Sequence, residues 1–205
     1  MTSPPPTPRL ILASQSASRR AMLDAAGVAY QAVPAHVDEE AAKESLRAGG
    51  ADPRALADAL AELKALKVSQ ANPGALVLGS DSLVALDDGS TLDKPESRDR
   101  AAQHLRLMSG KRHDLVSGAV IAENGRAVWR VVDRAKMFVR PLSDRFIDAY
   151  LDREWPAIAG CVGCYRIEGL GAQLFSRIEG SQFTVLGMPL LPVLDYLRTR
   201  AVLVA

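Results

Sequence analysis

The chain has 205 residues, of which 25 are Lys or Arg and 24 are Asp or Glu, so its formal net charge is +1. This balance excludes the strongly basic surface that nucleic-acid binding needs, and no apolar run is long enough to span a membrane. Residues 2–8 are rich in proline and lack the basic segment followed by an apolar segment that is typical of a signal peptide. We therefore expect a cytoplasmic protein, with a disordered extension at 1–8 and one two-lobed domain over 9–205, that binds neither nucleic acid nor a membrane.

The N-terminal segments predict a strand, a polar turn and a helix. Residues 9–13 are typical of a buried strand, and residues 18–26 have the pattern of a helix that ends at Gly27. A second short strand is expected at 30–34. The acidic stretch 37–40 that follows is interpreted as a loop.

The middle of the chain predicts a long helix and a central strand. Residues 53–70 have the apolar spacing of a helix rich in alanine and leucine. Residues 75–79 are continuously apolar, which fits a strand covered on both faces. We expect this strand to end at Ser80 and Asp81 and a further one at 83–86. Residues 97–108 predict another amphipathic helix.

The second half predicts a hairpin and two helices. Residues 114–122 and 127–139 alternate in polarity on either side of a Glu-Asn-Gly turn at 123–125. Helices are expected over about 142–153 and 190–200. Because helices and strands are interleaved, the sequence predicts an α/β fold with a mixed, twisted sheet and flanking helices.

Three alternating serines and two arginines lie where the first helix begins: Ser14, Ser16, Ser18, Arg19 and Arg20. A helix N-terminus presents unpaired N–H groups and the positive end of the helix dipole, which favours an anion. Arginines are unfavourable there without a negative partner, and the guanidinium matches phosphate oxygens. The alternative is that a serine only caps the helix while the arginines pair with surface carboxylates.

Acidic and basic candidates follow further along the chain. Asp81 ends the most apolar strand, where a carboxylate can hold a divalent cation, deprotonate water or simply cap a turn. Residues 38–40 offer oxygens for a magnesium shell, or form an exposed acidic loop. Lys64 and Lys94, taken singly, are ordinary solvated lysines. Glu168 lies beside glycines that permit close approach to a flat group, so it could accept hydrogen bonds from a base edge.

The two cysteines form a C-x-x-C sequence, Cys161 to Cys164. No second cysteine pair exists and the histidines are scattered, so a zinc site is disfavoured. We interpret both cysteines as small buried thiols, with a redox switch as the weaker alternative.

Five segments occur in an order that resembles one family: LILASQSASRR, VDEE, GSDSLVALDDG, LDKPESRDRAAQHLRLMSGKRHDLVSG and YRIEGLGAQLFSRIEGSQFTVLGMPLL. Together they resemble the Maf family of nucleoside triphosphate pyrophosphatases, relatives of the inosine triphosphate pyrophosphatases. The resemblance runs from Leu10 to about Leu197. It implies an elongated, two-lobed α/β fold with a central cleft, a homodimer, and house-cleaning hydrolysis of a nucleoside triphosphate to the monophosphate and pyrophosphate with Mg²⁺ or Mn²⁺.

The resemblance also implies roles for single residues. The general base is Asp81, which shares the metal with Glu39. The groups implied to bind the phosphates are Ser14, Ser16, Arg19, Arg20, Lys64 and Lys94.

Base preference is implied to depend on Ser18, Ser82 and Glu168. Glu168 favours the branch of the family that acts on 7-methyl-GTP. The two serines do not, because that branch usually has an aromatic residue at the position of Ser18 and a glutamine at the position of Ser82. A dTTP, UTP or broad-range pyrophosphatase is the alternative, as is a non-catalytic nucleotide-binding regulator of cell division.

Overall fold

The protein is described by a computed structural model over residues 9–204. The extension predicted at 1–8 lies outside the described residues. Contacts divide the chain into two compact units. Among the described residues, the first unit comprises 9–81, 117–133 and 187–204, and the second comprises Ser82–Val116 and Arg134–Leu186.

The strands form one mixed sheet in the order β2-β1-β3-β5-β6-β7, and β4 pairs with β3. β1 is parallel to both β2 and β3, whereas β4 is antiparallel to β3 and β7 is antiparallel to β6. The predicted mixed α/β fold is therefore confirmed. The strand bounds are β1 Leu10–Leu12, β2 Gln31–Ala32, β3 Leu76–Leu86, β4 Thr91–Leu92, β5 Arg112–Glu123, β6 Arg126–Val139 and β7 Phe175–Glu179.

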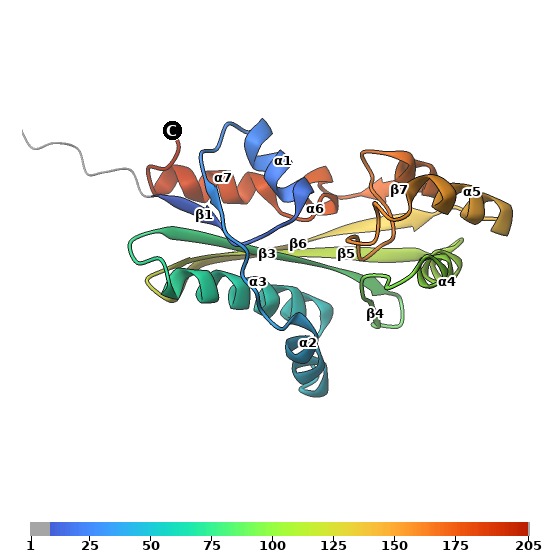
Figure 1. Ribbon diagram of the computed structural model, residues 1–205, viewed down its shortest axis with the longest axis horizontal. Helices are drawn as coiled ribbons and strands as arrows, with labels where there is room; N and C mark the ends of the chain where they lie inside the picture. The colour runs from blue at the N-terminus through green and yellow to red at the C-terminus, as the bar shows by residue number, and fades with distance from the viewer. Residues whose placement is uncertain (1–8, 205) are drawn as a thin grey trace, which may run out of the picture. The chain divides into compact units, whose positions relative to one another are not determined.

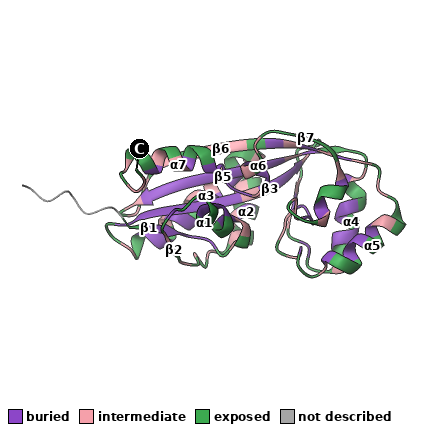
Figure 2. Ribbon diagram, turned by 90° about the horizontal axis from the view of Figure 1, so that it is seen from above, coloured by how far each residue is buried: buried purple, intermediate pink, exposed green. Residues whose placement is uncertain are grey.

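The long strands β3, β5 and β6 each contribute residues to both units. Both β3 and β5 are buried along most of their length (Figure 2). They are therefore covered on both faces, as the continuous apolar run in β3 predicts.

Helices cover both faces of the sheet in the first unit, with α2 and α3 on one face and α1 and α7 on the other (Figure 1). Ser16, Asp38 and Asp52 cap the first three helices, because each side chain accepts a hydrogen bond from a backbone N–H in the first turn. The helix bounds are α1 Ala17–Ala25, α2 Glu39–Ala48, α3 Pro53–Gln70 and α7 Leu190–Thr199.

The predicted end of α1 at Gly27 is confirmed. Gly27 has a φ of 67°, its N–H donates to the Asp24 carbonyl, and the Val28 N–H donates to the Leu23 carbonyl. This pair of bonds satisfies carbonyls that the end of a helix leaves without partners, and it requires the left-handed backbone that glycine adopts most easily.

Helix α3 packs onto the sheet through two glycines. A Cβ on Gly79 would overlap the carbonyl oxygen of Ala61, and a Cβ on Gly118 would lie 2.8 Å from the carbonyl oxygen of Ala57. The helix backbone can therefore approach β3 and β5 closely only because these positions have no side chain. Asp81 is two residues beyond Gly79, so its side chain is on the face that meets α3.

The second unit has its own core, which includes Leu105, Met137, Leu151 and Leu174. Its helices α4 and α5 are joined by ion pairs such as Arg98–Asp152 at 2.6 Å. The bounds of its helices are α4 Arg98–Met108, α5 Asp144–Glu154, the 3₁₀ helix η1 Leu170–Leu174 and α6 Gln182–Val185.

A buried histidine belongs to the second unit as well. His113 Nε2 lies 3.0 Å from the Tyr165 hydroxyl, and burial lowers the pKa of His113 to about 4. The imidazole is therefore neutral at physiological pH.

Two sequence expectations are wrong. First, β3 does not end at Ser80 and Asp81 but continues to Leu86, because both polar side chains have buried partners inside the fold. Second, residues 37–40 are not a loop throughout. Asp38 caps α2 and places Glu39 and Glu40 in the first helical turn, where the helix dipole favours carboxylates. The sequence did not indicate this helix because Lys43 is the residue that α2 buries, so the helix has no buried apolar stripe.

The remaining long elements agree with the sequence predictions within about three residues at either end. Within residues 9–204, none of the helices combines the length and the apolar character needed to cross a membrane.

Replacing Gly79 with alanine should push α3 away from β3, because the new Cβ overlaps backbone rather than a flexible side chain. We expect Gly79→Ala to lower the free energy of unfolding by about 1–3 kcal/mol in urea denaturation. Gly160→Ala is the matched control, since nothing lies within 4 Å of a Cβ there. Equal urea midpoints for the two variants would contradict this account of the packing.

Candidate active site

The centre of the site is a lysine held between two carboxylates. Lys64 Nζ donates to Asp81 Oδ1 at 2.6 Å and lies 2.9 Å from Glu39 Oε1. The side chains of Lys64 and Asp81 are each 9% exposed and that of Glu39 is 29% exposed. The three residues come from α3, β3 and the first turn of α2, so residues far apart in the sequence meet in the first unit.

Arg19 adds a second buried cation on α1. Its Nε donates to the Gly187 carbonyl at 2.8 Å, and its Nη1 donates to Ser14 Oγ at 3.3 Å. Burial lowers the pKa of Arg19, whereas the charges of Asp81 and Glu39 act in the opposite direction. Both carboxylates therefore stabilise the charged form of this guanidinium. We call Arg19, Glu39, Lys64 and Asp81 the four-charge cluster; its formal charges sum to zero.

The serines of the turn before α1 are connected to one another. Ser14 Oγ accepts the Ser16 N–H at 3.2 Å, and Ser16 Oγ lies 2.9 Å from Ser18 Oγ. Ser16 Oγ also accepts the Arg19 N–H at 3.4 Å. Ser16 is therefore the helix cap, as the alternative interpretation allowed. Ser14 differs because it is buried and touches the guanidinium of Arg19.

Sequence reasoning missed the groups that hold Arg19. Ser80 is fully buried, and its hydroxyl lies 2.8 Å from the Gly118 carbonyl and 3.1 Å from the Gly187 carbonyl, as donor to both. The Gly187 carbonyl thus receives Arg19 and Ser80 together. A serine inside a continuous apolar strand was the available signal, but its partner Gly187 is 107 positions away.

Arg20, a predicted phosphate ligand in the first unit, does not join the four-charge cluster. Its side chain is exposed, and its Nη2 donates to the Gln15 carbonyl at 3.1 Å. Successive residues of a helix point in different directions, so Arg19 and Arg20 have different surroundings.

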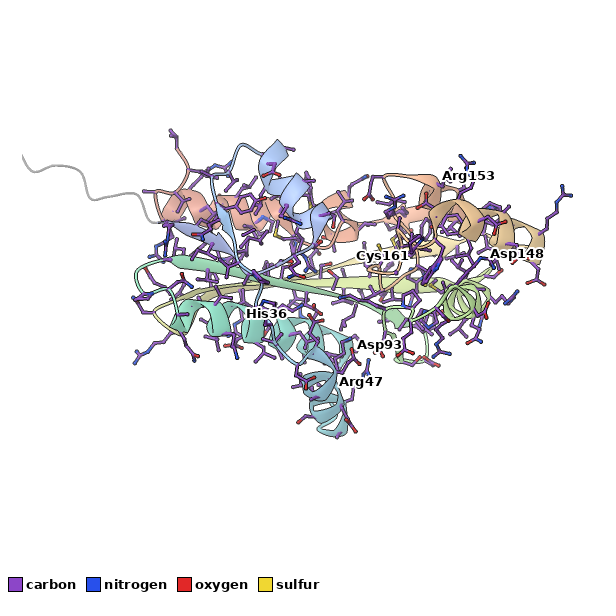
Figure 3. All side chains as sticks on the ribbon, in the orientation of Figure 1. His36, Arg47, Asp93, Asp148, Arg153 and Cys161 are labelled. Carbon is purple, nitrogen blue, oxygen red and sulfur yellow. The ribbon has the colours of Figure 1, made fainter. Side chains whose placement is uncertain are left out.

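The remaining predicted residues, Lys94, Ser82 and Glu168, belong to the second unit. Lys94 and Glu168 are exposed, and Ser82 is half-buried in β3. Burial is the main cause that raises the pKa of the Cys161 thiol; the charge of Glu168 raises this pKa further and the charge of Lys94 lowers it. Cys161 lies in the segment between α5 and η1 (Figure 3).

The two cysteines are free thiols, and the prediction that both are buried is right for Cys164 but not for Cys161, which is half-buried. Burial raises the pKa of Cys161, and it raises the pKa of Cys164 to about 12. Both groups are therefore protonated near neutral pH, whereas thiol oxidation and exchange need the thiolate. These surroundings favour the interpretation as packed thiols.

Glu39 and Asp81 supply the type of oxygen ligand that Mg²⁺ and Mn²⁺ take. Among residues 9–204, no group of three or more His, Cys, Asp or Glu side chains is placed to hold a metal ion. Glu39 and Asp81, however, direct one oxygen each at the same ammonium. Mg²⁺ typically takes one or two carboxylates and completes its shell with water and phosphate oxygens. The pair of residues therefore matches a Mg²⁺ or Mn²⁺ ion better than it matches a zinc site.

Known proteins resemble this chain along nearly its whole length. A family model described as "Maf-like protein" matches residues 9–200. A nucleoside triphosphate pyrophosphatase of Sphingopyxis alaskensis is 56% identical, with 92% of this chain and 96% of that protein covered. A 7-methyl-GTP pyrophosphatase of Rhizobium meliloti is 48% identical, with 93% and 96% covered.

Among solved structures, a HAM1 protein from Coxiella burnetii has a TM-score of 0.45 at 14% identity, with 64% of this chain and 73% of that chain covered. The match to the family model over almost all described residues, together with the two long sequence matches, shows that this chain belongs to the Maf family.

Proposed function

We propose that this protein hydrolyses a nucleoside triphosphate to the monophosphate and pyrophosphate. The observation that carries the proposal is the four-charge cluster, in which two buried cations and two carboxylates meet beside a serine-rich helix N-terminus. Relatives named nucleoside triphosphate pyrophosphatase match along nearly the whole chain, which supports the same activity here.

The cationic side chains suit the leaving group. When water attacks the α-phosphorus, negative charge accumulates on the departing pyrophosphate. Arg19, which the Gly187 carbonyl and Ser14 already hold in place, would offset this charge with little reorganisation, and Lys64 would add a second positive charge. Ser14 and the first turn of α1 would add neutral donors to phosphate oxygens.

The carboxylates would serve the nucleophile and the metal. Asp81 would take a proton from the attacking water. Glu39 and Asp81 would hold Mg²⁺ or Mn²⁺, which when bound supplies positive charge to the phosphate oxygens. Asp81 is buried on a central strand, so its carboxylate is held in place rather than left free to rotate in solvent.

The choice of nucleobase is a finer proposal. Glu168 offers a carboxylate to the hydrogen-bond donors of a guanine edge, and a relative at 48% identity is named 7-methyl-GTP pyrophosphatase. We therefore propose 7-methyl-GTP as the first candidate substrate and dTTP, UTP or a broad range as the alternative. Ser82 and Ser18 are the other proposed determinants, and Lys94 is proposed to face the phosphates. A homodimer and a cytoplasmic location are further proposals that come from the sequence alone.

The purified protein should release pyrophosphate from at least one nucleotide in a screen of canonical and modified triphosphates with Mg²⁺. Because Glu39 and Asp81 are proposed to hold a divalent cation that the reaction needs, EDTA should abolish pyrophosphate release by removing that cation. Mg²⁺ or Mn²⁺ in excess should restore release. Tight nucleotide binding without any release would instead favour the non-catalytic regulator.

Replacing Asp81 with asparagine keeps the shape of the side chain and removes its charge. We expect Asp81→Asn to lower kcat by about a hundredfold or more, because a proton acceptor and a metal ligand are lost together. Asp87→Asn is the control, since that aspartate is exposed and pairs with Arg112. Unchanged turnover in Asp81→Asn, with a native circular dichroism spectrum, would remove Asp81 from the mechanism.

Arg19 and Arg20 should respond differently to the same conservative change. A lysine at position 19 retains the charge but cannot donate to both Gly187 and Ser14 through one planar group. Arg19→Lys should therefore reduce kcat/KM by about tenfold or more, and Arg20→Lys by a smaller factor. Steady-state kinetics of the two variants measures both losses in kcat/KM. A loss for Arg20→Lys that equals or exceeds the loss for Arg19→Lys would contradict the assignment of Arg19, rather than Arg20, to the four-charge cluster.

A further inference from the structure

Lys64 occupies the position that the proposed metal needs. Its ammonium lies 2.6 Å from Asp81 Oδ1 and 2.9 Å from Glu39 Oε1, the two residues whose carboxylates would hold the cation. Mg²⁺ and Mn²⁺ bind carboxylate oxygens directly. An ammonium hydrogen-bonded to the same oxygens would then lie a few ångströms from a divalent charge, and at such a separation in a buried site two cations repel strongly.

The two buried cations of the cluster differ in how firmly they are held. Arg19 donates to a backbone carbonyl through Nε and to Ser14 through Nη1, so both ends of its guanidinium are fixed. Lys64 has carboxylate partners at Nζ and a flexible four-carbon stem. Its Cα is on α3, whose backbone packs against Gly79 and Gly118. The ammonium can therefore move while its helix stays in place.

We propose that Lys64 is a placeholder for the divalent cation: in the nucleotide-free protein its ammonium bridges Glu39 and Asp81, and the metal binds by displacing it. This inference rests on the proposed function and adds an order of events to it. With the lysine in place the four-charge cluster is neutral. Entry of a divalent cation makes the site doubly positive and frees Lys64 to meet the phosphates. The site therefore becomes attractive to a triphosphate only when the metal is present.

The first test measures Mn²⁺ binding in the absence of nucleotide. The electron paramagnetic resonance signal of free Mn²⁺ reports how much of the metal remains unbound. Lys64→Met removes the competing ammonium while keeping an unbranched side chain of similar length. We expect this variant to bind Mn²⁺ about tenfold or more tightly than the wild type. Lys67→Met is the matched control, because Lys67 is exposed one turn further along α3 and should leave Mn²⁺ affinity unchanged. Equal or weaker Mn²⁺ binding by Lys64→Met would overturn the placeholder role.

A second test uses the wild-type chain, so it does not depend on how the variant folds. An acetyl N-hydroxysuccinimide ester modifies accessible amines, and mass spectrometry reports each lysine separately. Lys64 should be acetylated slowly without metal and several-fold faster with saturating Mn²⁺, while the rate at Lys67 stays constant. In Asp81→Asn the Mn²⁺ dependence at Lys64 should disappear. A Lys64 rate that Mn²⁺ does not change would overturn the exchange.

The two proposals fail separately. A wild-type protein that releases no pyrophosphate from any nucleotide, yet passes both Mn²⁺ tests, would refute the proposed function and leave the exchange standing. A protein that releases pyrophosphate, but whose Lys64 neither competes with Mn²⁺ nor changes its reactivity, would retain the function and lose the placeholder.

Discussion

The buried ion pair between Lys64 and Asp81 is the interaction on which the rest of the site depends. A lone carboxylate inside a central strand would be costly to keep charged, and a lone ammonium inside a helix–sheet interface would be equally costly. At 2.6 Å each group offsets the desolvation of the other. Losing one partner would leave an uncompensated buried charge.

This pairing in turn depends on how closely α3 packs against the sheet. Gly79 and Gly118 let the backbone of the helix touch β3 and β5, and Lys64 then reaches the strand that carries Asp81. On the other face of the same strand, Ser80 reaches the Gly187 carbonyl, which also receives Arg19. Consecutive residues of β3 therefore contact Lys64 directly, through Asp81, and share the Gly187 carbonyl with Arg19, through Ser80.

The residues proposed to act on the substrate are divided between the two units. The four-charge cluster belongs to the first unit, and the second unit contains Lys94, Ser82 and Glu168. Lys94 and Glu168 are proposed to serve the phosphates and the base, respectively. The boundary between the units falls between Asp81 and Ser82, so the proposed general base ends the first segment of one unit and a proposed specificity residue begins the other.

The sequence by itself determined the interleaved α/β pattern, the long helix 53–70 and most of the candidate site residues, because apolar periodicity and a run of motifs are local signals. It did not reveal α2, whose exposed surface lacks that periodicity, and it ended β3 too early because polar residues usually mark the end of a strand. Only the tertiary structure decided that Lys64 lies between Glu39 and Asp81, that Arg19 is buried while Arg20 faces solvent, and that Gly187 holds Arg19. Such pairings join positions up to 168 residues apart, and packing sets their distances, which no local pattern records.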